Sequence, residues 1–377
     1  MTEGNIAQLL SDIWYAGVKS VSGRQVVETA LKSDPPYEPD LVIAVGKAAS
    51  GMCLGALSSV SKYGKAIVVT KYEHVDDSLS DFPNVQIIES GHPLPDENSL
   101  LAGRAISDAI QALDSGARLL FLVSGGASAL AEVLPDDMTL DEWQKKTEEM
   151  IASGMSIDAI NAERKVVSLI KDGKLLQMFH GKEARVYGIS DVEGDDIRVI
   201  GSGIAYVKDP GCEYATRLIG TNAIARSGSV RESVARGFAV QLNEESLYED
   251  VFDLAPRIVE TLSTGSPGVY IWGGEPTIKL PDKPGKGGRN QSLALEIALG
   301  LEGKCNITVL VAGTDGTDGP TNAAGAIING ETCDDRAAAE RALSAADAGS
   351  YLGSRDCLFI TGATNTNVMD LVIALVQ

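Results

Sequence analysis

The chain has 377 residues, which is too long for one ordinary hydrophobic core, so two domains of similar size are expected. Its formal net charge of -20 argues against nucleic acid as a partner, because nucleic-acid-binding proteins normally present a basic face. Five cysteines without paired spacing predict neither a zinc site nor a disulfide framework. No apolar run approaches the ~18 residues of a membrane span and the start does not resemble a signal peptide, so we expect no membrane partner and a cytoplasmic location.

Short apolar runs alternate with helical patterns along the first half, which is typical of a parallel sheet flanked by helices. The predicted strands cover residues 41–44, 66–70, 85–89, 119–123 and 186–189. Residues 100–113 and 140–151 are predicted helices.

The same pattern restarts in the second half. A short strand at 218–219 and a helix at 223–235 are followed by predicted strands at 269–272, 307–312, 325–328 and 358–361. Because residues 208–212 are rich in turn formers, we place the boundary near Gly211, giving domains 1–211 and 212–377. The predicted fold class is α/β, with two Rossmann-like domains of mostly parallel sheet and an active-site cleft between them.

Small and polar residues follow nearly every predicted strand. Gly46 and Lys47 come after the first strand, Ser124 begins the loop after the fourth, and Asp191 follows the fifth. In open α/β sheets, ligands bind outside the carboxyl ends of the strands, where helix N-termini offer free N–H groups to anions. These loops are therefore the predicted ligand-binding region.

Lys47 and the segment from Ser124 to Ser128 each allow two interpretations. Lys47 is either a solvated side chain or a point charge on a phosphate or carboxylate; the Walker A pattern is absent, because Met52 and Cys53 stand where Lys-Ser or Lys-Thr would be. The glycines between the two serines serve either tight packing or an anion cradle of backbone N–H groups. A serine hydrolase is disfavoured, since the nucleophile-elbow pattern is missing.

The segment from Gly285 to Gly325 carries the most information. Lys286 and Arg289 lie among glycines, where a backbone can approach an anion closely, and Arg289 offers a planar fork suited to phosphate oxygens. Asp315 and Asp318 directly follow a predicted buried strand. They are candidates for holding magnesium, although Asp beside Gly also commonly forms local turns.

Two further features remain open. Asp191, with Asp195 and Asp196, forms a second acidic cluster that is either a surface loop or a source of a metal ligand or base. His92, in a Pro-rich loop, is expected to be a locally bonded loop histidine rather than a catalyst.

Taken in order, the motifs resemble the glycerate 2-kinase family, also called the MOFRL family and formerly labelled hydroxypyruvate reductase. The matching segments are Val45-Gly-Lys-Ala-Ala, Gly91-His-Pro-Leu-Pro-Asp, Val123-Ser-Gly-Gly-Ala-Ser-Ala-Leu, Ser190-Asp-Val-Glu-Gly-Asp-Asp, Gly273-Gly-Glu-Pro-Thr, Gly287-Gly-Arg-Asn-Gln-Ser, Gly313-Thr-Asp-Gly-Thr-Asp-Gly-Pro-Thr-Asn-Ala-Ala-Gly and Thr361-Gly-Ala-Thr-Asn-Thr-Asn-Val. They span most of the chain. The chain departs from the family pattern at Ala127, Ala363 and Asn365, where the family usually has Gly, Pro and Gly.

The resemblance implies a kinase that transfers the γ-phosphoryl group of ATP to the 2-hydroxyl of D-glycerate with Mg²⁺, giving 2-phosphoglycerate and ADP. It carries the family's functional lysine onto Lys47, its arginine onto Arg289, and its acidic residues onto Asp191 and Asp315, which are also the candidate metal ligands. The expected substrate- and nucleotide-binding residues are Gly46, Ser124, Gly125, Gly126, Ser128, Gly287, Gly288, Asn290, Thr314, Asp318 and Asn367.

Two alternatives stay open beside the kinase. An NAD(P)H-dependent hydroxypyruvate reductase would want Gly-x-Gly-x-x-Gly after an early strand, and residues 45–51 do not supply it. A non-catalytic regulator that binds nucleotides or sugar phosphates would be favoured by missing carboxylates, yet Asp191 and Asp315 are both present. Small molecules are the expected partners, and a homodimer is left open.

Overall fold

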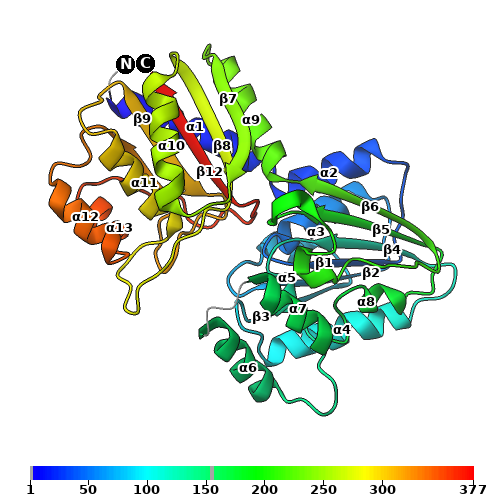
Figure 1. Cartoon of the computed structure of the whole chain (residues 1–377). Coiled ribbons are helices and arrows are strands. Elements are labelled where there is room, and N and C mark those ends of the chain that lie inside the picture. Colours follow the sequence, from blue (N-terminus) through cyan, green and yellow to red (C-terminus); the bar gives the residue numbers. More distant parts are fainter. Residues whose placement is uncertain (1–2, 153–156) are drawn as a thin grey trace. The chain divides into compact units, whose positions relative to one another are not determined.

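The computed structural model describes residues 3–152 and 157–377, which fold into two compact units (Figure 1). Val21–Thr221 and Asn365–Asn367 form one, here called the parallel-sheet unit. Met1–Ser20, Asn222–Thr364 and Val368–Gln377 form the other, the mixed-sheet unit.

Six strands make the sheet of the parallel-sheet unit, in the order β3-β2-β1-β4-β5-β6, and every neighbouring pair is parallel. The strands are β1 (Leu41–Val45), β2 (Lys65–Lys71), β3 (Val85–Ser90), β4 (Arg118–Val123), β5 (Glu183–Ile189) and β6 (Glu213–Gly220). All five residues of β1 are buried, as expected for a strand covered on both faces. The first five predicted strands are therefore confirmed.

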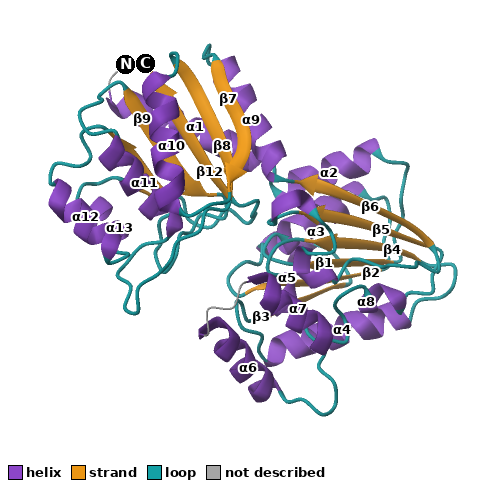
Figure 2. Ribbon diagram, viewed as in Figure 1, coloured by secondary structure: helices purple, strands orange, loops and turns teal. Residues whose placement is uncertain are grey.

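Helices cover both faces of this sheet (Figure 2). They are α2 (Gly23–Ser33), α3 (Ala49–Ser59), α4 (Glu97–Gln111), α5 (Ala127–Leu130), α6 (Leu140–Ala152), α7 (Ile157–Val167) and α8 (Lys174–Gln177), with short 3-10 turns η1 (Asp77–Asp81), η2 (Glu193–Asp195) and η3 (Ile200–Gly203). The strand order reverses between β1 and β4. In doubly wound sheets this reversal marks the crevice in which ligands bind.

The mixed-sheet unit also has six strands, in the order β11-β10-β9-β12-β8-β7. The strands are β7 (Val240–Leu247), β8 (Gly268–Gly274), β9 (Ile307–Gly313), β10 (Gly325–Asn329), β11 (Leu358–Phe359) and β12 (Asp370–Val376). Of these pairs β7 and β8 alone are parallel, and the others are antiparallel. The prediction of a mostly parallel sheet in both domains is thus wrong for this unit.

Helices of the mixed-sheet unit likewise lie on both faces of its sheet (Figure 2). They are α1 (Glu3–Lys19), α9 (Asn222–Ala235), α10 (Val251–Thr264), α11 (Arg289–Gly300), α12 (Arg336–Ser344) and α13 (Ala348–Gly353). The α/β class is therefore confirmed for both units.

The first helix, α1, belongs to the mixed-sheet unit although it begins the chain. Its Trp14 is fully buried and meets Phe359 edge to face, with 5.2 Å between the ring centroids. The units thus differ from the predicted domains 1–211 and 212–377 in their membership. The predicted strand at 218–219 is the end of β6 and completes the parallel sheet, so it does not open the second domain.

Within the residues that the structure describes, none of the helices combines the length and the apolar character needed to cross a membrane.

Candidate active site

The loops after β1 and β4 are joined by hydrogen bonds at the point where the strand order reverses. The amide of Lys47 donates to the carbonyl oxygen of Gly125 over 2.9 Å, and the amide of Ala48 donates to Ser124 Oγ over 3.0 Å. Gly46 has φ of +131°, and a side chain there would run into Ser124. The glycine and the serine therefore fix the backbone that presents Lys47.

Asp191 lies against the same loop. A Cβ atom on Gly125 would overlap the carboxylate of Asp191, so the carboxylate lies directly on the glycine backbone. Asn367 Nδ2 donates to Asp191 Oδ2 over 3.5 Å, which brings a residue from near the end of the chain to this place. The structure therefore places Lys47, Asp191 and Asn367 around the same loop, and their roles in a site stay predictions.

His92 lies beside the loop as well. Gly126 has φ of +85°, and a Cβ built on it would be 3.1 Å from His92 Cδ2 and 3.3 Å from Lys47 Cγ. The expectation was a locally bonded loop histidine and not a catalyst; the structure adds only that His92 lies near Gly126. Its segment was quoted as a family motif without a role, and local spacing does not give the contact, because two strands, β2 and β1, separate β3 from β4 in the sheet.

The two predicted serines differ in their surroundings. Ser124 is buried and its hydroxyl accepts the amide of Ala48, so it organises the loop. Ser128 Oγ lies 2.8 Å from Ser202 Oγ, at the start of the short helix α5. A ligand role for either hydroxyl stays a prediction.

In the mixed-sheet unit, β12 runs antiparallel to β8 and β9, so the first residue of β12 lies beside the last residues of those two strands. Asp370, the first residue of β12, pairs with Gly274 at the end of β8 and with Gly313 at the end of β9. Its carboxylate accepts from Arg289 Nε at 2.7 Å, and Glu275 Oε1 lies 2.8 Å from Arg289 Nη2. Burial acts to lower the pKa of Arg289, but the charges of Asp370 and Glu275 outweigh it and hold that pKa above its ordinary value.

Asp318 caps the helix that carries Arg289. It accepts the amides of Asn290 at 3.1 Å and Gln291 at 2.8 Å, and a side chain on Gly288 would collide with it. Burial raises the pKa of Asp318 to about 6, against the lowering effect of those two amides. Both of its oxygens are used by the helix start, which is a structural task beside the predicted ligand role.

The remaining predicted residues of this unit lie at the same ends of β8 and β9 and at the start of α11. Gly287 has φ of +146° and precedes the helix. Thr314 is buried and its Oγ1 donates to the carbonyl oxygen of Met369 over 2.6 Å. Asp315 Oδ1 accepts from the amide of Thr317 at 3.0 Å, so the local turn that the sequence left open is present.

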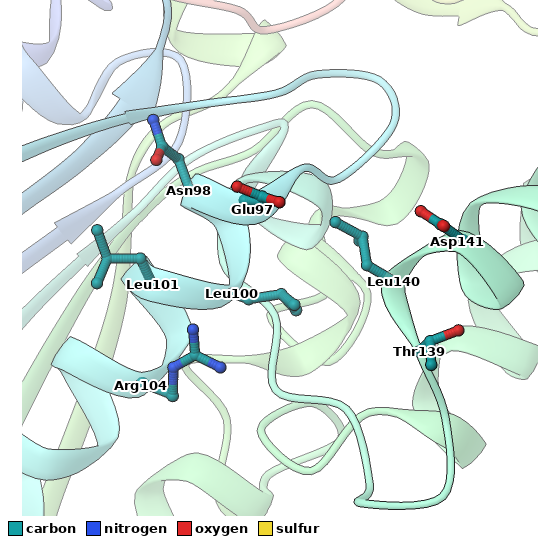
Figure 3. A pocket seen from close by; sticks show the side chains of 8 residues that line it. All are labelled: Glu97, Asn98, Leu100, Leu101, Arg104, Thr139, Leu140 and Asp141. Atoms are coloured by element: carbon teal, nitrogen blue, oxygen red, sulfur yellow. The ribbon is translucent and has the colours of Figure 1, made fainter.

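Residues 3–152 and 157–377 contain no group of three or more His, Cys, Asp and Glu side chains arranged to hold a metal ion. A hollow of about 540 Å³ lies between α4 and the start of α6 (Figure 3). Its lining consists of Glu97, Asn98, Leu100, Leu101, Arg104, Thr139, Leu140 and Asp141, and includes none of the predicted site residues.

Comparison with known proteins decides the family. Residues 9–236 match the family described as "Domain of unknown function (DUF4147)", and residues 268–370 match the MOFRL family. A protein of Thermotoga maritima named D-glycerate 2-kinase is 33% identical over 94% of both chains. The chain belongs to the glycerate 2-kinase (MOFRL) family.

A solved family member has the same fold, and relatives by sequence carry different names. The crystal structure of a glycerate kinase from Thermotoga maritima superposes with a TM-score of 0.88 at 31% identity, covering 99% of this chain and 100% of that chain. A protein of Agrobacterium vitis carries the provisional name hydroxypyruvate reductase and is 31% identical over 89% of this chain and 99% of its own.

Sequence reasoning missed two carboxylates of this family member. Glu275 stood within a motif that was quoted but given no role. Asp370 was overlooked with the whole of β12, although a lone acidic residue before six consecutive apolar residues is a usable strand-start signal.

Proposed function

We propose that this chain is an ATP-dependent kinase that phosphorylates the 2-hydroxyl of D-glycerate, with Mg²⁺ accompanying the nucleotide. The observation that carries the proposal is the cradle where the strand order reverses, in which Lys47, the bare backbone of Gly125 and Gly126, and Asp191 meet. The likeness to a protein named D-glycerate 2-kinase over nearly the whole chain supports the same reaction.

Phosphoryl transfer depends on in-line positioning and on neutralising charge, and needs little covalent chemistry from the protein. Lys47 would supply a point charge, and glycine amides would approach phosphate oxygens closely. Arg289 would bind a phosphoryl group or the glycerate carboxylate.

Magnesium fits the residues that are present. Mg²⁺ usually keeps several waters and binds through one or two protein carboxylates together with substrate phosphates. Asp191 supplies a carboxylate directly on the glycine backbone, with the amide of Asn367 beside it, and Asp315 supplies another in its own unit. The ion would neutralise phosphate charge, and the remaining carboxylate would accept the proton of the substrate hydroxyl.

The reductase alternative is not favoured. The loop that follows β1 reads Val-Gly-Lys-Ala-Ala-Ser-Gly over residues 45–51, without the Gly-x-Gly-x-x-Gly spacing that admits a dinucleotide pyrophosphate. In a dinucleotide site the backbone of this loop would have to approach the pyrophosphate closely, and Lys47 stands in that loop. A lysine at this position is better suited to binding a single anionic group.

The deciding experiment incubates the pure protein with D-glycerate, ATP and Mg²⁺ and identifies the product by NMR. We expect ADP and 2-phosphoglycerate, and no turnover when the divalent cation is omitted. Formation of 3-phosphoglycerate would contradict the assigned position. Oxidation of NADH dependent on hydroxypyruvate, without any phosphorylated product, would establish the reductase instead.

A further inference from the structure

Arg289 is held by two carboxylates that differ in burial. Asp370 accepts from Arg289 Nε at 2.7 Å and from Nη2 at 3.4 Å, and its side chain is 3% exposed. Glu275 meets Nη2 at 2.8 Å, but its side chain is 44% exposed. Exposed ion pairs contribute little, whereas a buried and hydrogen-bonded carboxylate strongly restrains its partner.

The backbone of Asp370 is fixed before its side chain acts. The residue lies between the ends of β8 and β9, paired with Gly274 and Gly313. Its carbonyl oxygen also accepts from Asn222 Nδ2 at 3.2 Å. A Cβ on Gly313 would lie only 3.1 Å from Asp370 Oδ1, so the carboxylate has little room to turn.

The guanidinium is therefore restrained along one edge only. Nε and Nη2 of Arg289 contact carboxylates, and no hydrogen bond from Nη1 is found among the described residues. The Arg289 side chain is 35% exposed, so that part of it remains accessible. A planar fork fixed at one edge can present its other donors to an anion without first losing conformational freedom.

We propose that Asp370 is a positioning residue for phosphoryl transfer, which orients the guanidinium of Arg289 toward the anionic group of the substrate. This assignment rests on the proposed kinase function. It places at the amino end of a strand a carboxylate that serves the site without touching the substrate.

The test is a double-mutant cycle between Asp370→Asn and Arg289→Lys, with kcat and KM measured for D-glycerate and ATP. Because misplacing a reacting group mainly slows the chemical step, we expect Asp370→Asn to lower kcat at least ~10-fold with KM changed less than about threefold. Arg289→Lys should lower kcat by a similar factor, since an ammonium lacks the fork. The double variant should fall within about threefold of the worse single variant, as expected for residues that act as one unit.

Asp334→Asn is the matched control. It removes one carboxylate charge from an arginine ion pair of the same unit, the exposed pair with Arg355. Its kcat should stay within about twofold of the wild type. Circular dichroism and thermal melting verify that each variant is folded. Effects that simply multiply in the double variant, or wild-type kcat in folded Asp370→Asn, overturn the assignment.

A second variant keeps the test decisive if Asp370→Asn does not fold. Glu275→Gln removes the more exposed contact, and it should lower kcat less than Arg289→Lys does, because the buried Asp370 still orients the guanidinium. A loss as large as that of Arg289→Lys would show that the exposed Glu275, and not the buried Asp370, sets the orientation, and it would overturn the assignment. The two proposals also fail differently: absence of phosphorylated product with wild-type protein overturns the kinase function, whereas an active wild type with an insensitive Asp370 overturns this assignment alone.

Discussion

Lys171 and Glu132 are the most deeply buried charged pair among the described residues. Lys171 Nζ lies 2.6 Å from Glu132 Oε2, and both side chains are almost completely buried. Burial lowers the pKa of Lys171, while the charge of Glu132 opposes that change. The carboxylate also accepts from Ser168 Oγ and from the amide of Val133. The pair is therefore part of a buried network in which the charged groups are hydrogen-bonded.

Breaking this pair should strongly destabilise the protein. Lys171→Met keeps the volume but leaves Glu132 as an uncompensated buried charge, so we expect a loss of about 3–5 kcal/mol in the free energy of unfolding. Adding Glu132→Gln removes that charge and should restore more than half of the loss. Urea unfolding of the two variants measures both values. A loss below about 1 kcal/mol for Lys171→Met would mean that water or another group compensates Glu132.

Single residues were predictable where a motif follows a strand. Lys47 follows β1 and Asp191 follows β5. The structure places both of them against the loop that begins at Ser124. His92 and Asp370 were not assigned to a site, because their places depend on which strands are neighbours and on strand direction. Neither quantity is encoded in local spacing.

At the scale of elements, the free amides at the start of α11 are capped by a carboxylate from another loop, and not by a hydroxyl or amide side chain at the N-cap. Asp318 reaches the helix start from the loop after β9 and accepts the amides of its second and third residues, Asn290 and Gln291. The carboxylate is buried, and burial raises its pKa from the ordinary 3.8 to about 6. The start of the helix that carries Arg289 is therefore sensitive to pH.

The sign of this effect follows from proton linkage. Between about pH 4 and pH 6 the folded protein binds the Asp318 proton more tightly than the unfolded chain does, so stability falls as pH rises. The contribution is fully present below about pH 4 and is lost as pH rises through about 6. Relative to Asp318→Asn, which does not titrate, the wild type should lose melting temperature over this range. Thermal melts of both proteins at several pH values test it, and a constant difference would contradict the raised pKa.

Most strands of both sheets were predicted, whereas β7, β12 and the antiparallel strand directions of the mixed sheet were not. The strands β1 to β5 contain short apolar runs, and β1 is buried along its whole length, which is the kind of pattern that the sequence indicates without a structure. By contrast, β7 reads Val-Gln-Leu-Asn-Glu-Glu-Ser-Leu at a sheet edge, where polar residues are tolerated, and it was missed. Alternating strand and helix signals favoured a parallel sheet, but β9 to β12 pair antiparallel because their connections do not cross over the sheet in βαβ fashion.

At the scale of the whole molecule, neither unit is one continuous segment. The mixed-sheet unit needs α1 from the start of the chain, and Leu10, Ile13 and Trp14 of that helix are fully buried. These side chains are buried when α1 packs on the sheet, and burial of each one contributes about 1.5–3 kcal/mol or more to the free energy of folding.

Fragments test this dependence. A fragment of residues 222–377 should not unfold cooperatively on heating, because it lacks α1. The same fragment followed by a flexible Gly/Ser linker and residues 3–20 should regain a cooperative transition and a near-UV circular dichroism signal from Trp14. Cooperative melting of residues 222–377 alone would show that α1 is dispensable.

The central position of β12 has a further consequence for how the protein is made. Residues 20–369 separate α1 from the strand that it packs against, and a ribosome adding about 5–20 residues per second needs roughly 20–70 s to cross that interval. Before β12 is made, the ribosome has already synthesised residues 21–221, while the sheet of the mixed-sheet unit still lacks the strand between β9 and β8. A stop codon in place of the Asp370 codon would therefore delete a middle strand of the sheet together with a partner of Arg289. The mixed-sheet unit can therefore form its complete sheet only after β12 has been translated.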